Sequence, residues 1–353
     1  MELNKLLEEV IIKKASDLHL TVGAPPTMRL NGRLMPMTTI PLCAEDTRKC
    51  IEVLIENRTE LLAQLESQGQ VDFAYTFLEK GRFRVNAFRQ CDHLAVALRV
   101  IKSQVPSMTA LKLPEPILRH LTSLSSGLVL ITGPTGVGKS TTLAAMIDDI
   151  NTHDAKHILT LEEPIEFLHP HKKSIVVQRE IGRDSSSYQG ALKAALREDP
   201  DVILIGEMRD QETILAAMTA AETGHLVLST LHTTSAVQTI DRMIDAFPVE
   251  RQSQVRVQLA NVLKGVIAQQ LLPCKYQEER VVALEIMLMN QAIRHLMREQ
   301  KTHQIYSQIQ MGASAGMMTM ETSIKRLYEA GVISLEVAKQ YTQAPEELND
   351  YMS

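Results

Sequence analysis

A glycine-rich stretch, GPTGVGKSTT at residues 133–142, carries the residue types that bind nucleotide phosphates. It satisfies the pattern G-x-x-x-x-G-K-[ST] and follows an apolar run typical of a strand. Glycines let backbone N–H groups turn toward phosphate oxygens, and the dipole of a following helix favours the same anions. Lys139 would reach the β- and γ-phosphates, and Ser140 would ligate Mg²⁺. The predicted nucleotide-binding residues are Gly133, Pro134, Thr135, Gly136, Val137, Gly138, Lys139, Ser140 and Thr141.

Carboxylates follow two further apolar runs. The run DVILIGE ends in Glu207, where a P-loop enzyme holds a carboxylate that positions Mg²⁺ or water. The run HILTLEE ends in Glu162 and Glu163, and the sequence leaves open which of the two meets the attacking water. Ligands of parallel sheets bind beyond the carboxyl ends of the strands. We therefore expect Glu163 and Glu207 near Lys139, with Ser140 and Glu207 as the Mg²⁺ ligands.

Two histidines flank the apolar run LVLSTL at residues 226–231. His232 follows the run, so it is expected on the nucleotide side, close to the two carboxylates. His225 precedes the run, so strand geometry puts it at the opposite edge of the sheet unless the strand starts later. A lone histidine beside a strand is usually structural, but two of them in a nucleotide-binding domain make both candidate catalytic residues. The sequence leaves the position of His225 open.

The elements that must position these residues change type along the chain. Residues 118–353 alternate continuous apolar runs with helical patterns, which indicates a parallel sheet covered on both faces. From about residue 249 the pattern is mostly helical, with VVALEIML as one added strand. Residues 102–117 hold three prolines and are expected to form an interdomain linker.

The first part of the chain, residues 1–101, is expected to form a small α+β unit. An amphipathic helix opens it, and a helical stretch covers roughly residues 44–66. Short alternating strands, with a hairpin turn at Asn31 and Gly32, predict an antiparallel sheet.

Composition narrows the class of protein. The chain has 353 residues, enough for two or three domains, and its net charge of −5 gives no basic field for nucleic acid. No apolar run reaches the roughly 20 residues that a membrane-spanning helix needs. The four cysteines form no CxxC pair, so the sequence predicts neither a zinc site nor a disulfide framework. A reduced cytoplasmic protein without a nucleic-acid partner is expected.

Four stretches together resemble one group of enzymes. GPTGVGKSTTLAAMID, LTLEEPIEF, REDPDVILIGEMRD and TGHLVLSTLHTTSA look like the Walker A, Asp box, Walker B and His box of type II/IV secretion ATPases. Within that superfamily the chain is similar to the retraction ATPases of type IV pili, the PilT family. SDLHL, GRFRVNAFRQ and AIRHLMRE carry this narrower match. The resemblance covers nearly the whole chain.

The resemblance implies an α/β protein with a PAS-like N-terminal domain and a RecA-like P-loop domain with a helical C-terminal extension. It implies a homohexamer that hydrolyses ATP with Mg²⁺ and powers pilus retraction and twitching motility. Its expected partners are a platform protein of the inner membrane, at whose cytoplasmic face it would act, and a paralogous retraction ATPase. Family arginines that approach the nucleotide map to Arg82 and Arg84.

The chain departs from the family pattern at some positions, and other functions compete. Glu163 stands where the family often has Asp, Val137 replaces a commoner serine, and His295 and Met297 alter the AIRNLIRE motif. One alternative is an accessory retraction ATPase that docks on the main motor. Another is a pilus assembly or type II secretion ATPase, but those chains are longer and carry a tetracysteine insertion, whereas this chain offers only Cys274 in that region. The acidic net charge argues against a nucleic-acid translocase.

Overall fold

The computed structural model describes residues 2–30, 32–56, 58–78, 80–101, 104–276 and 279–342. The chain divides into two compact units, residues 1–104 with 166–168 and residues 105–165 with 169–353. Parts of three sequence predictions lie outside the described residues: Asn31 of the hairpin turn, Lys102 and Ser103 of the linker, and residues 343–353 of the C-terminal region. The domain limits given by the sequence stay a prediction, and helix α4 begins at Glu115, inside the predicted linker.

The N-terminal unit is built on a six-stranded sheet in the order β3-β2-β1-β6-β5-β4. Every neighbouring pair is antiparallel, as the alternating strands predict. Strand residues such as Phe83 and Val85 are buried together with Leu7 and Leu54 of the helices. The strands are β1 (Asp17–Leu20), β2 (Thr27–Leu30), β3 (Arg33–Pro36), β4 (Gln70–Phe77), β5 (Gly81–Gln90) and β6 (His93–Ile101). The helices are α1 (Leu3–Ile12), α2 (Ala44–Ile55) and α3 (Thr59–Gln68).

The single helical stretch expected at 44–66 is two helices in the structure, α2 and α3. Helix α2 ends because Glu56 adopts a positive φ of 55°. The guanidinium of Arg58 then donates to the carbonyl oxygens of Leu54 at 2.6 Å and Ile55 at 3.0 Å, which satisfies the end of the helix. No glycine or proline marks this break, so the sequence pattern did not reveal it.

The second unit is built on a seven-stranded sheet in the order β13-β12-β7-β11-β10-β8-β9. All neighbouring strands pair in parallel except β12 with β13, which confirms the predicted parallel-rich sheet. The strands are β7 (Gly127–Thr132), β8 (His157–Glu162), β9 (Ile175–Glu180), β10 (Val202–Ile205), β11 (Leu226–Leu231), β12 (Leu263–Pro273) and β13 (Arg280–Leu288).

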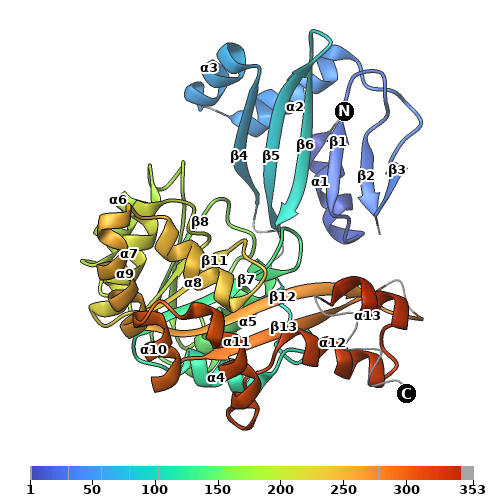
Figure 1. Cartoon of the computed structure of the whole chain (residues 1–353). Helices are drawn as coiled ribbons and strands as arrows, with labels where there is room; N and C mark the ends of the chain where they lie inside the picture. The colour runs from blue at the N-terminus through green and yellow to red at the C-terminus, as the bar shows by residue number, and fades with distance from the viewer. Residues whose placement is uncertain are drawn as a thin grey trace. The chain divides into compact units, whose positions relative to one another are not determined.

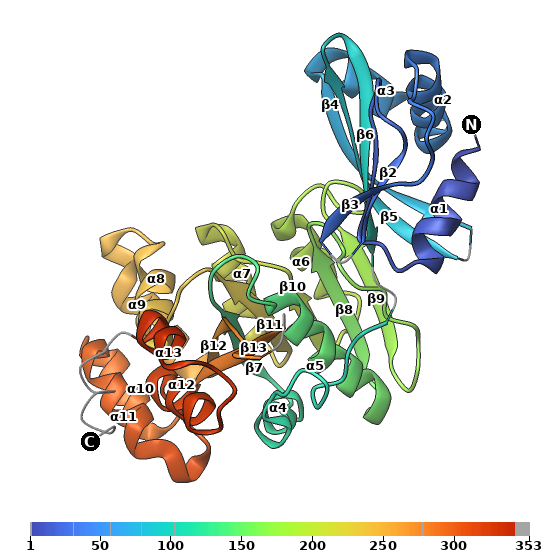
Figure 2. The same cartoon turned by 90° about the vertical axis from the view of Figure 1, so that its right-hand side faces the viewer.

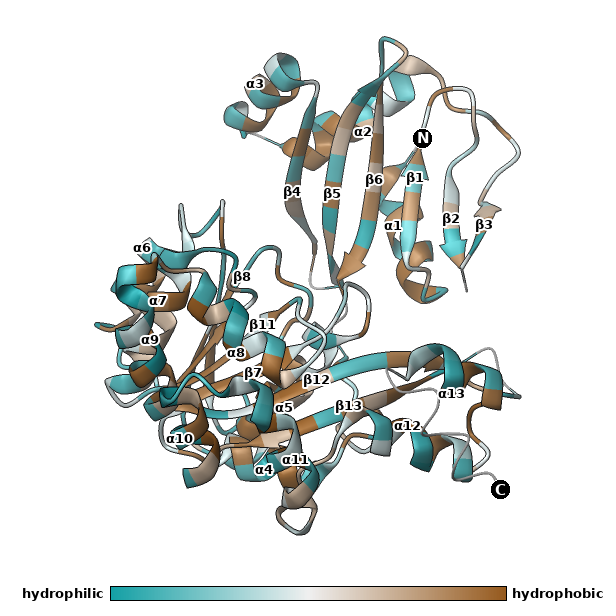
Figure 3. Cartoon of the chain, viewed as in Figure 1, coloured by the Kyte–Doolittle hydropathy of each residue, from teal (hydrophilic) through white to brown (hydrophobic). Residues whose placement is uncertain are grey.

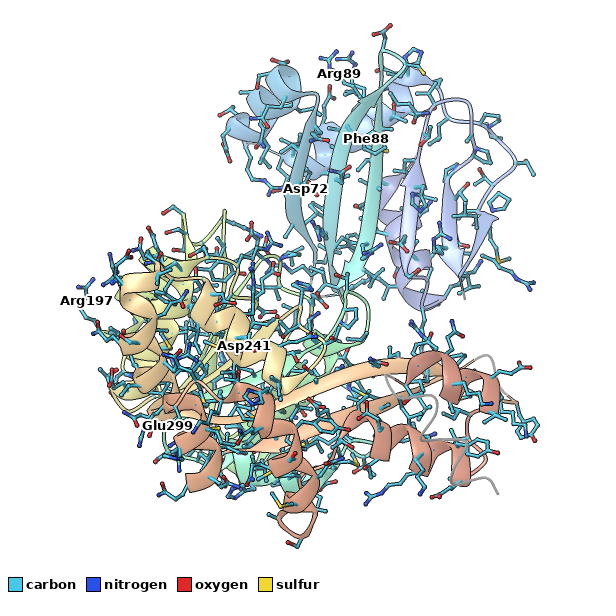
Figure 4. All side chains as sticks on the ribbon, viewed as in Figure 1. Asp72, Phe88, Arg89, Arg197, Asp241 and Glu299 are labelled. Carbon is cyan, nitrogen blue, oxygen red and sulfur yellow. The ribbon has the colours of Figure 1, made fainter. Side chains whose placement is uncertain are left out.

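Helices cover both faces of this sheet, and the strands are accordingly hydrophobic along their length (Figures 1 and 3). Leu128 and Leu130 of β7 pack on one face, in a core shared with α6 (Tyr188–Ala195), α7 (Gln211–Glu222), α8 (Ala236–Asp245) and α9 (Val249–Val262). Val129 and Ile131 pack on the other face with α4 (Glu115–Thr122) and α5 (Lys139–His153). Charged side chains such as Arg197 and Glu299 extend outward from this unit (Figure 4).

The C-terminal part combines helices with two strands, so the expectation of a mostly helical region from about residue 249 is wrong in one respect. The stretch LKGVIAQQLLP forms β12, which pairs in parallel with β7 and antiparallel with β13. Helices α12 (Met320–Glu329) and α13 (Leu335–Tyr341) pack on these two strands (Figure 2). The remaining elements are α10 (Gln291–Arg298), η1 (Thr302–Gln304), α11 (Ile305–Met311), η2 (Gly312–Ala315), α12 (Met320–Glu329) and α13 (Leu335–Tyr341). Within the described residues, no helix combines the length and apolar character needed to cross a membrane.

Candidate nucleotide-binding site

The glycine-rich loop joins the buried strand β7 to helix α5. Gly133 has φ 141°, and a side chain there would lie 2.3 Å from the carbonyl oxygen of Gln269. Gly138 precedes the helix with φ 89°, and no side chain of the described residues caps the helix N-terminus. Because the first N–H groups of a helix have no intrahelical partner, this end of α5 suits an anion. The loop therefore fits the phosphate groups that its sequence predicts.

The loop is held from the side by Gln269, a buried residue of the neighbouring strand β12. Its Nε2 donates to the carbonyl oxygen of Val137 at 2.7 Å, and its Oε1 accepts from the hydroxyl of Thr142 at 3.0 Å. One side chain thus ties the loop to the first turn of α5. Gln269 was not among the residues that the sequence singled out.

Lys139 lies folded over the loop. Its Nζ donates to the carbonyl oxygens of Gly133 at 2.8 Å and Pro134 at 3.0 Å, and it lies 3.4 Å from Nδ1 of His232. The side chain is buried, whereas the outer part of the loop is open to solvent. The exposed residues of the loop are Pro134, Thr135 and Gly136, and the partly exposed ones are Val137, Gly138, Ser140 and Thr141.

The carboxylate of Glu207 lies between two basic side chains. Nε2 of His232 is 3.1 Å from its Oε2, and Nη2 of Arg209 forms a salt bridge with its Oε1. Burial would raise the pKa of Glu207, but the hydrogen bonds and charges of His232 and Arg209 outweigh it and hold the pKa below its ordinary value. The structure thus brings Lys139, His232 and Glu207, from three separate motifs, into one connected row. Arg209 was not among the residues that the sequence singled out.

Short hydrogen bonds fix the strand ends that carry these motifs. The hydroxyl of Thr230 donates to the carbonyl oxygen of Gly206 at 2.6 Å, which links β11 to the turn before Glu207. The N–H of Gly206 donates to the carbonyl oxygen of Leu161 at 2.8 Å, which links the same turn to β8. Because backbone and buried hydroxyl groups make these bonds, the carboxyl ends of β8, β10 and β11 hold a fixed relation to one another.

The two glutamates after β8 have different surroundings. Glu162 accepts hydrogen bonds from the hydroxyl of Thr160 at 2.7 Å and from Nε2 of Gln178 at 3.3 Å. Burial is the main cause of the raised pKa of Tyr188, and the hydrogen bond with Glu207 is the main cause of the raised pKa of Arg209; the charge of Glu163, which is exposed, adds to both. Glu163 therefore belongs to the neighbourhood of Glu207, whereas Glu162 is held by the sheet.

Tyr188, the first residue of α6, is a further member of this neighbourhood that the sequence did not reveal. Its hydroxyl is buried and has no hydrogen-bond partner among the described residues. Burial, and after it the charges of Glu163, Glu207 and Glu162, raises the pKa of the phenol.

His225 lies at the other edge of the sheet. Its carbonyl oxygen accepts from the N–H of Gly127, the first residue of β7, and its Nδ1 lies 3.0 Å from the carbonyl oxygen of Ala220. Lys139 follows the opposite end of β7, and a strand of this length spans about 20 Å. Within the chain, the structure therefore does not bring His225 to Lys139 and His232.

Arg82 and Arg84 lie on β5 of the N-terminal unit. They alternate with Phe83 and Val85, which are fully buried, so the two arginines share the opposite face of the strand. Nε of Arg84 is 3.8 Å from Oδ1 of Asp72 on β4, which Figure 4 labels. Their approach to a nucleotide stays a prediction.

Comparison with known proteins gives consistent matches over nearly the whole chain. Residues 1–351 match the family described as Type II/IV secretion system protein. The chain is 46% identical over 346 residues to the type IV pilus retraction ATPase PilT of Pseudomonas aeruginosa. The aligned region covers 98% of this chain and 99% of that protein. The chain is 40% identical over 349 residues to the type IV pilus ATPase PilU of the same organism, covering 99% and 90%. A crystal structure of the pilus retraction motor PilT with bound ADP matches with a TM-score of 0.92 and 46% identity, covering 99% of both chains.

Proposed function

Because the chain belongs to the family of type II/IV secretion system proteins, we propose that it is an ATP-driven motor that retracts type IV pili. The resemblance to the PilT family is confirmed, and with it the assignment of an ATPase. The observation that carries the activity is the row from Lys139 through His232 to Glu207, because it joins the phosphate loop to the residues that follow two other strands. The full-length similarity to PilT supports retraction as the work performed.

In this proposal the loop residues 133–141 bind the phosphates of ATP. Lys139 exchanges the loop carbonyls of Gly133 and Pro134 for phosphate oxygens, since those carbonyls already show where its ammonium group reaches. The hydroxyl of Ser140 and the carboxylate of Glu207 are oxygen donors, which suit Mg²⁺, and they would hold the ion. When bound, the ion neutralises charge on the phosphates.

Glu163 is the better candidate for activating the attacking water. Glu162 is engaged by Thr160 and Gln178, so its carboxylate is committed to the sheet. Glu163 is exposed, and its charge acts on Tyr188 and Arg209, close to Glu207. His232, which contacts both Lys139 and Glu207, is suited to sense the γ-phosphate.

The activity is tested by measuring phosphate release from ATP by the purified protein with and without Mg²⁺. We expect Mg²⁺-dependent hydrolysis that is lost in Lys139→Ala, because the variant lacks the ammonium group that contacts the phosphates. Lys173→Ala is the matched control, since Lys173 is an exposed lysine that donates to the carbonyl oxygen of His153. An unchanged rate in Lys139→Ala would contradict the assignment.

The direction of the work is tested in cells that lack this chain. A retraction motor predicts pili that are still assembled, are more numerous and do not retract, whereas an assembly ATPase predicts the loss of pili. The similarity to PilU keeps an accessory role as the second candidate. That role predicts that the chain cannot restore retraction when it is the sole retraction ATPase in the cell.

The proposal includes a homohexamer that acts at the cytoplasmic face of the inner membrane on a platform protein of the pilus. The similarity to PilT over the whole chain supports it. Analytical ultracentrifugation with and without ATP tests the hexamer, and a monomer under all conditions would contradict it. Co-purification from cell membranes tests the platform partner.

A further inference from the structure

Arg209 lies in the short segment between strand β10 and helix α7. The N–H of the buried Met208 donates to the carbonyl oxygen of Thr230 at 3.2 Å, which holds this segment to β11. Asp210 caps α7, because its carboxylate accepts from the N–H of Thr213 at 2.8 Å. Since the backbone is fixed on both sides of Arg209, a change of position falls to its side chain.

The two carboxylate oxygens of Glu207 are both engaged by basic side chains. Arg209 forms a salt bridge with Oε1, and Nε2 of His232 lies 3.1 Å from Oε2. A carboxylate binds Mg²⁺ through these same oxygens. One of the two basic side chains must therefore give up its oxygen before Glu207 can act as a metal ligand.

Arg209 is the neighbour of Glu207 that is free to leave. His232 also lies 3.4 Å from Nζ of Lys139, so contacts hold its ring on both sides. The side chain of Arg209 is 68% exposed, and within the described residues its salt bridge is to Glu207. Exposed salt bridges are weak, because water solvates both partners once they separate. Oε1 is therefore the oxygen that Glu207 can offer to a metal.

The phosphates of ATP would give the displaced guanidinium a new partner. Its planar set of N–H donors bonds phosphate oxygens in pairs. Glu207 and His232 connect Arg209 to Lys139, so phosphates bound by Lys139 come within reach of the guanidinium. Mg²⁺ alone offers Arg209 no anion and repels its charge. The metal and the phosphates therefore help each other to enter the site.

We propose that Arg209 holds Oε1 of Glu207 until Mg²⁺ arrives with ATP, and then moves from the carboxylate to the phosphates. The inference rests on the proposed ATPase function. It makes Arg209 the residue that couples metal binding to nucleotide binding, because Mg²⁺ alone must displace a cation that gains no other partner.

The test measures binding of Mn²⁺, which takes the same oxygen ligands as Mg²⁺, by electron paramagnetic resonance of the full-length protein. Without nucleotide, Arg209→Gln should bind Mn²⁺ about tenfold more tightly than the wild-type protein, because no bond between charged groups has to break. Its affinity for the Mn²⁺ complex of a non-hydrolysable ATP analogue should not rise, because the variant also lacks the guanidinium that contacts the phosphates. Arg119→Gln is the matched control, since Arg119 is an exposed arginine of the same unit that pairs with Asp149 at 3.1 Å.

The background of Glu207→Gln shows whether Arg209 acts through this carboxylate. Adding Arg209→Gln there should leave Mn²⁺ binding unchanged, because the carboxylate that the guanidinium covers is already gone. A tenfold gain in that background would overturn the proposal, as would an Arg209→Gln variant that binds Mn²⁺ no better than the wild-type protein. An equal gain with the ATP analogue would also overturn it, since Arg209 would then only compete with the metal. Each of these results leaves the ATPase assignment intact, whereas both proposals fail if the wild-type protein hydrolyses no ATP.

Discussion

At the scale of single residues, the ionisation of Glu207 links the site to pH. Its pKa is held below the ordinary value of 4.5 because His232 and Arg209 outweigh the effect of burial. A carboxyl group with a lowered pKa in the folded state contributes stability above its unfolded pKa, and this contribution is lost as pH falls through the folded pKa.

We therefore predict a pH-dependent difference between the wild-type protein and Glu207→Gln. The variant should be less stable by about 2 kcal/mol at neutral pH, since hydrogen bonds to a charged group are lost. The difference should stay constant down to about pH 4.5 and shrink below it. Urea unfolding at several pH values measures this, with Glu212→Gln on the exposed side of α7 as the control. A difference that grows at acid pH would contradict it.

The two adjacent glutamates allow a second prediction at this scale. Glu163→Gln should lower kcat for ATP about 100-fold or more, because a general base is removed. Its KM for ATP should hardly change, since the phosphate loop is intact. Glu162→Gln should have the smaller effect on kcat, since Glu162 is bonded to Thr160 and Gln178. Steady-state kinetics of the two variants decide between them, and the reverse order would assign the water to Glu162.

The sequence could place Lys139, His232 and Glu207 in one site because each directly follows a strand, and parallel strands end at the same edge. The same rule favoured the other edge for His225 unless the strand started later, and the structure places it at that edge. The rule could not identify Tyr188, which begins helix α6, or Gln269, which lies inside strand β12. Their contacts are made with residues distant in the sequence, Gly206 and the phosphate loop, so no local pattern encodes them.

At the scale of elements, strand β12 supports the phosphate loop through Gln269. Gln269→Leu should weaken ADP binding about tenfold, because the carbonyl of Val137 and the hydroxyl of Thr142 lose their partner and the loop loses its fixed shape. Fluorescence titration with a labelled nucleotide measures the affinity. Gln270→Leu is the matched control, since the next residue of the strand points to the other face. Equal affinities in the two variants would contradict the role of Gln269.

Strand β13 joins two helices through one buried carboxyl group. Oε1 of Glu285 accepts from the N–H of Ala236 at 2.7 Å, at the start of α8 after His232, and the N–H of Met320 at the start of α12 also donates to it. Burial outweighs these bonds and raises the pKa of Glu285 above its ordinary value. Between the unfolded and the folded pKa, the folded state keeps a proton that the unfolded state releases, so stability falls as pH rises.

The raised pKa of Glu285 predicts how the free energy of unfolding changes with pH. Relative to Glu285→Gln, which does not titrate, the wild-type protein should lose stability as pH rises from about 4.5 through the folded pKa. Glu285→Ala should be less stable than both, by about 2 kcal/mol or more, because two buried N–H groups lose their acceptor. Urea unfolding at pH 5 and pH 8 compares the three proteins. A wild-type protein that gains stability over this range relative to Glu285→Gln would contradict the raised pKa.

The sequence missed strand β12 for a physical reason. Strand β12 follows helix α9 without a glycine or proline between them, and its apolar run fits a buried helix as well as a strand. It forms a strand because it pairs with β7, which is distant in the sequence, and with the following strand β13. Strands β7, β8, β10 and β11 were predicted because turns and amphipathic helices bound each of them.

At the scale of the whole molecule, the change of sequence pattern near residue 100 predicted an antiparallel unit followed by a parallel one, and the two sheets confirm that order. The nucleotide residues that the structure brings together all belong to the second unit. The first unit carries Arg82 and Arg84 on β5, and we propose that they act in hydrolysis only within the proposed ring.

If Arg82 and Arg84 approach the nucleotide in the ring, their positive charges stabilise the transition state. Arg82→Ala and Arg84→Ala should each lower kcat for ATP about tenfold or more, with little change in ADP affinity, because the phosphate loop lies in the other unit. Arg89→Ala, at an exposed position of the same strand, is the matched control (Figure 4). Ultracentrifugation shows whether each variant still forms the ring. If both variants form the ring and hydrolyse ATP at the wild-type rate, the prediction is wrong and these arginines take no part in hydrolysis.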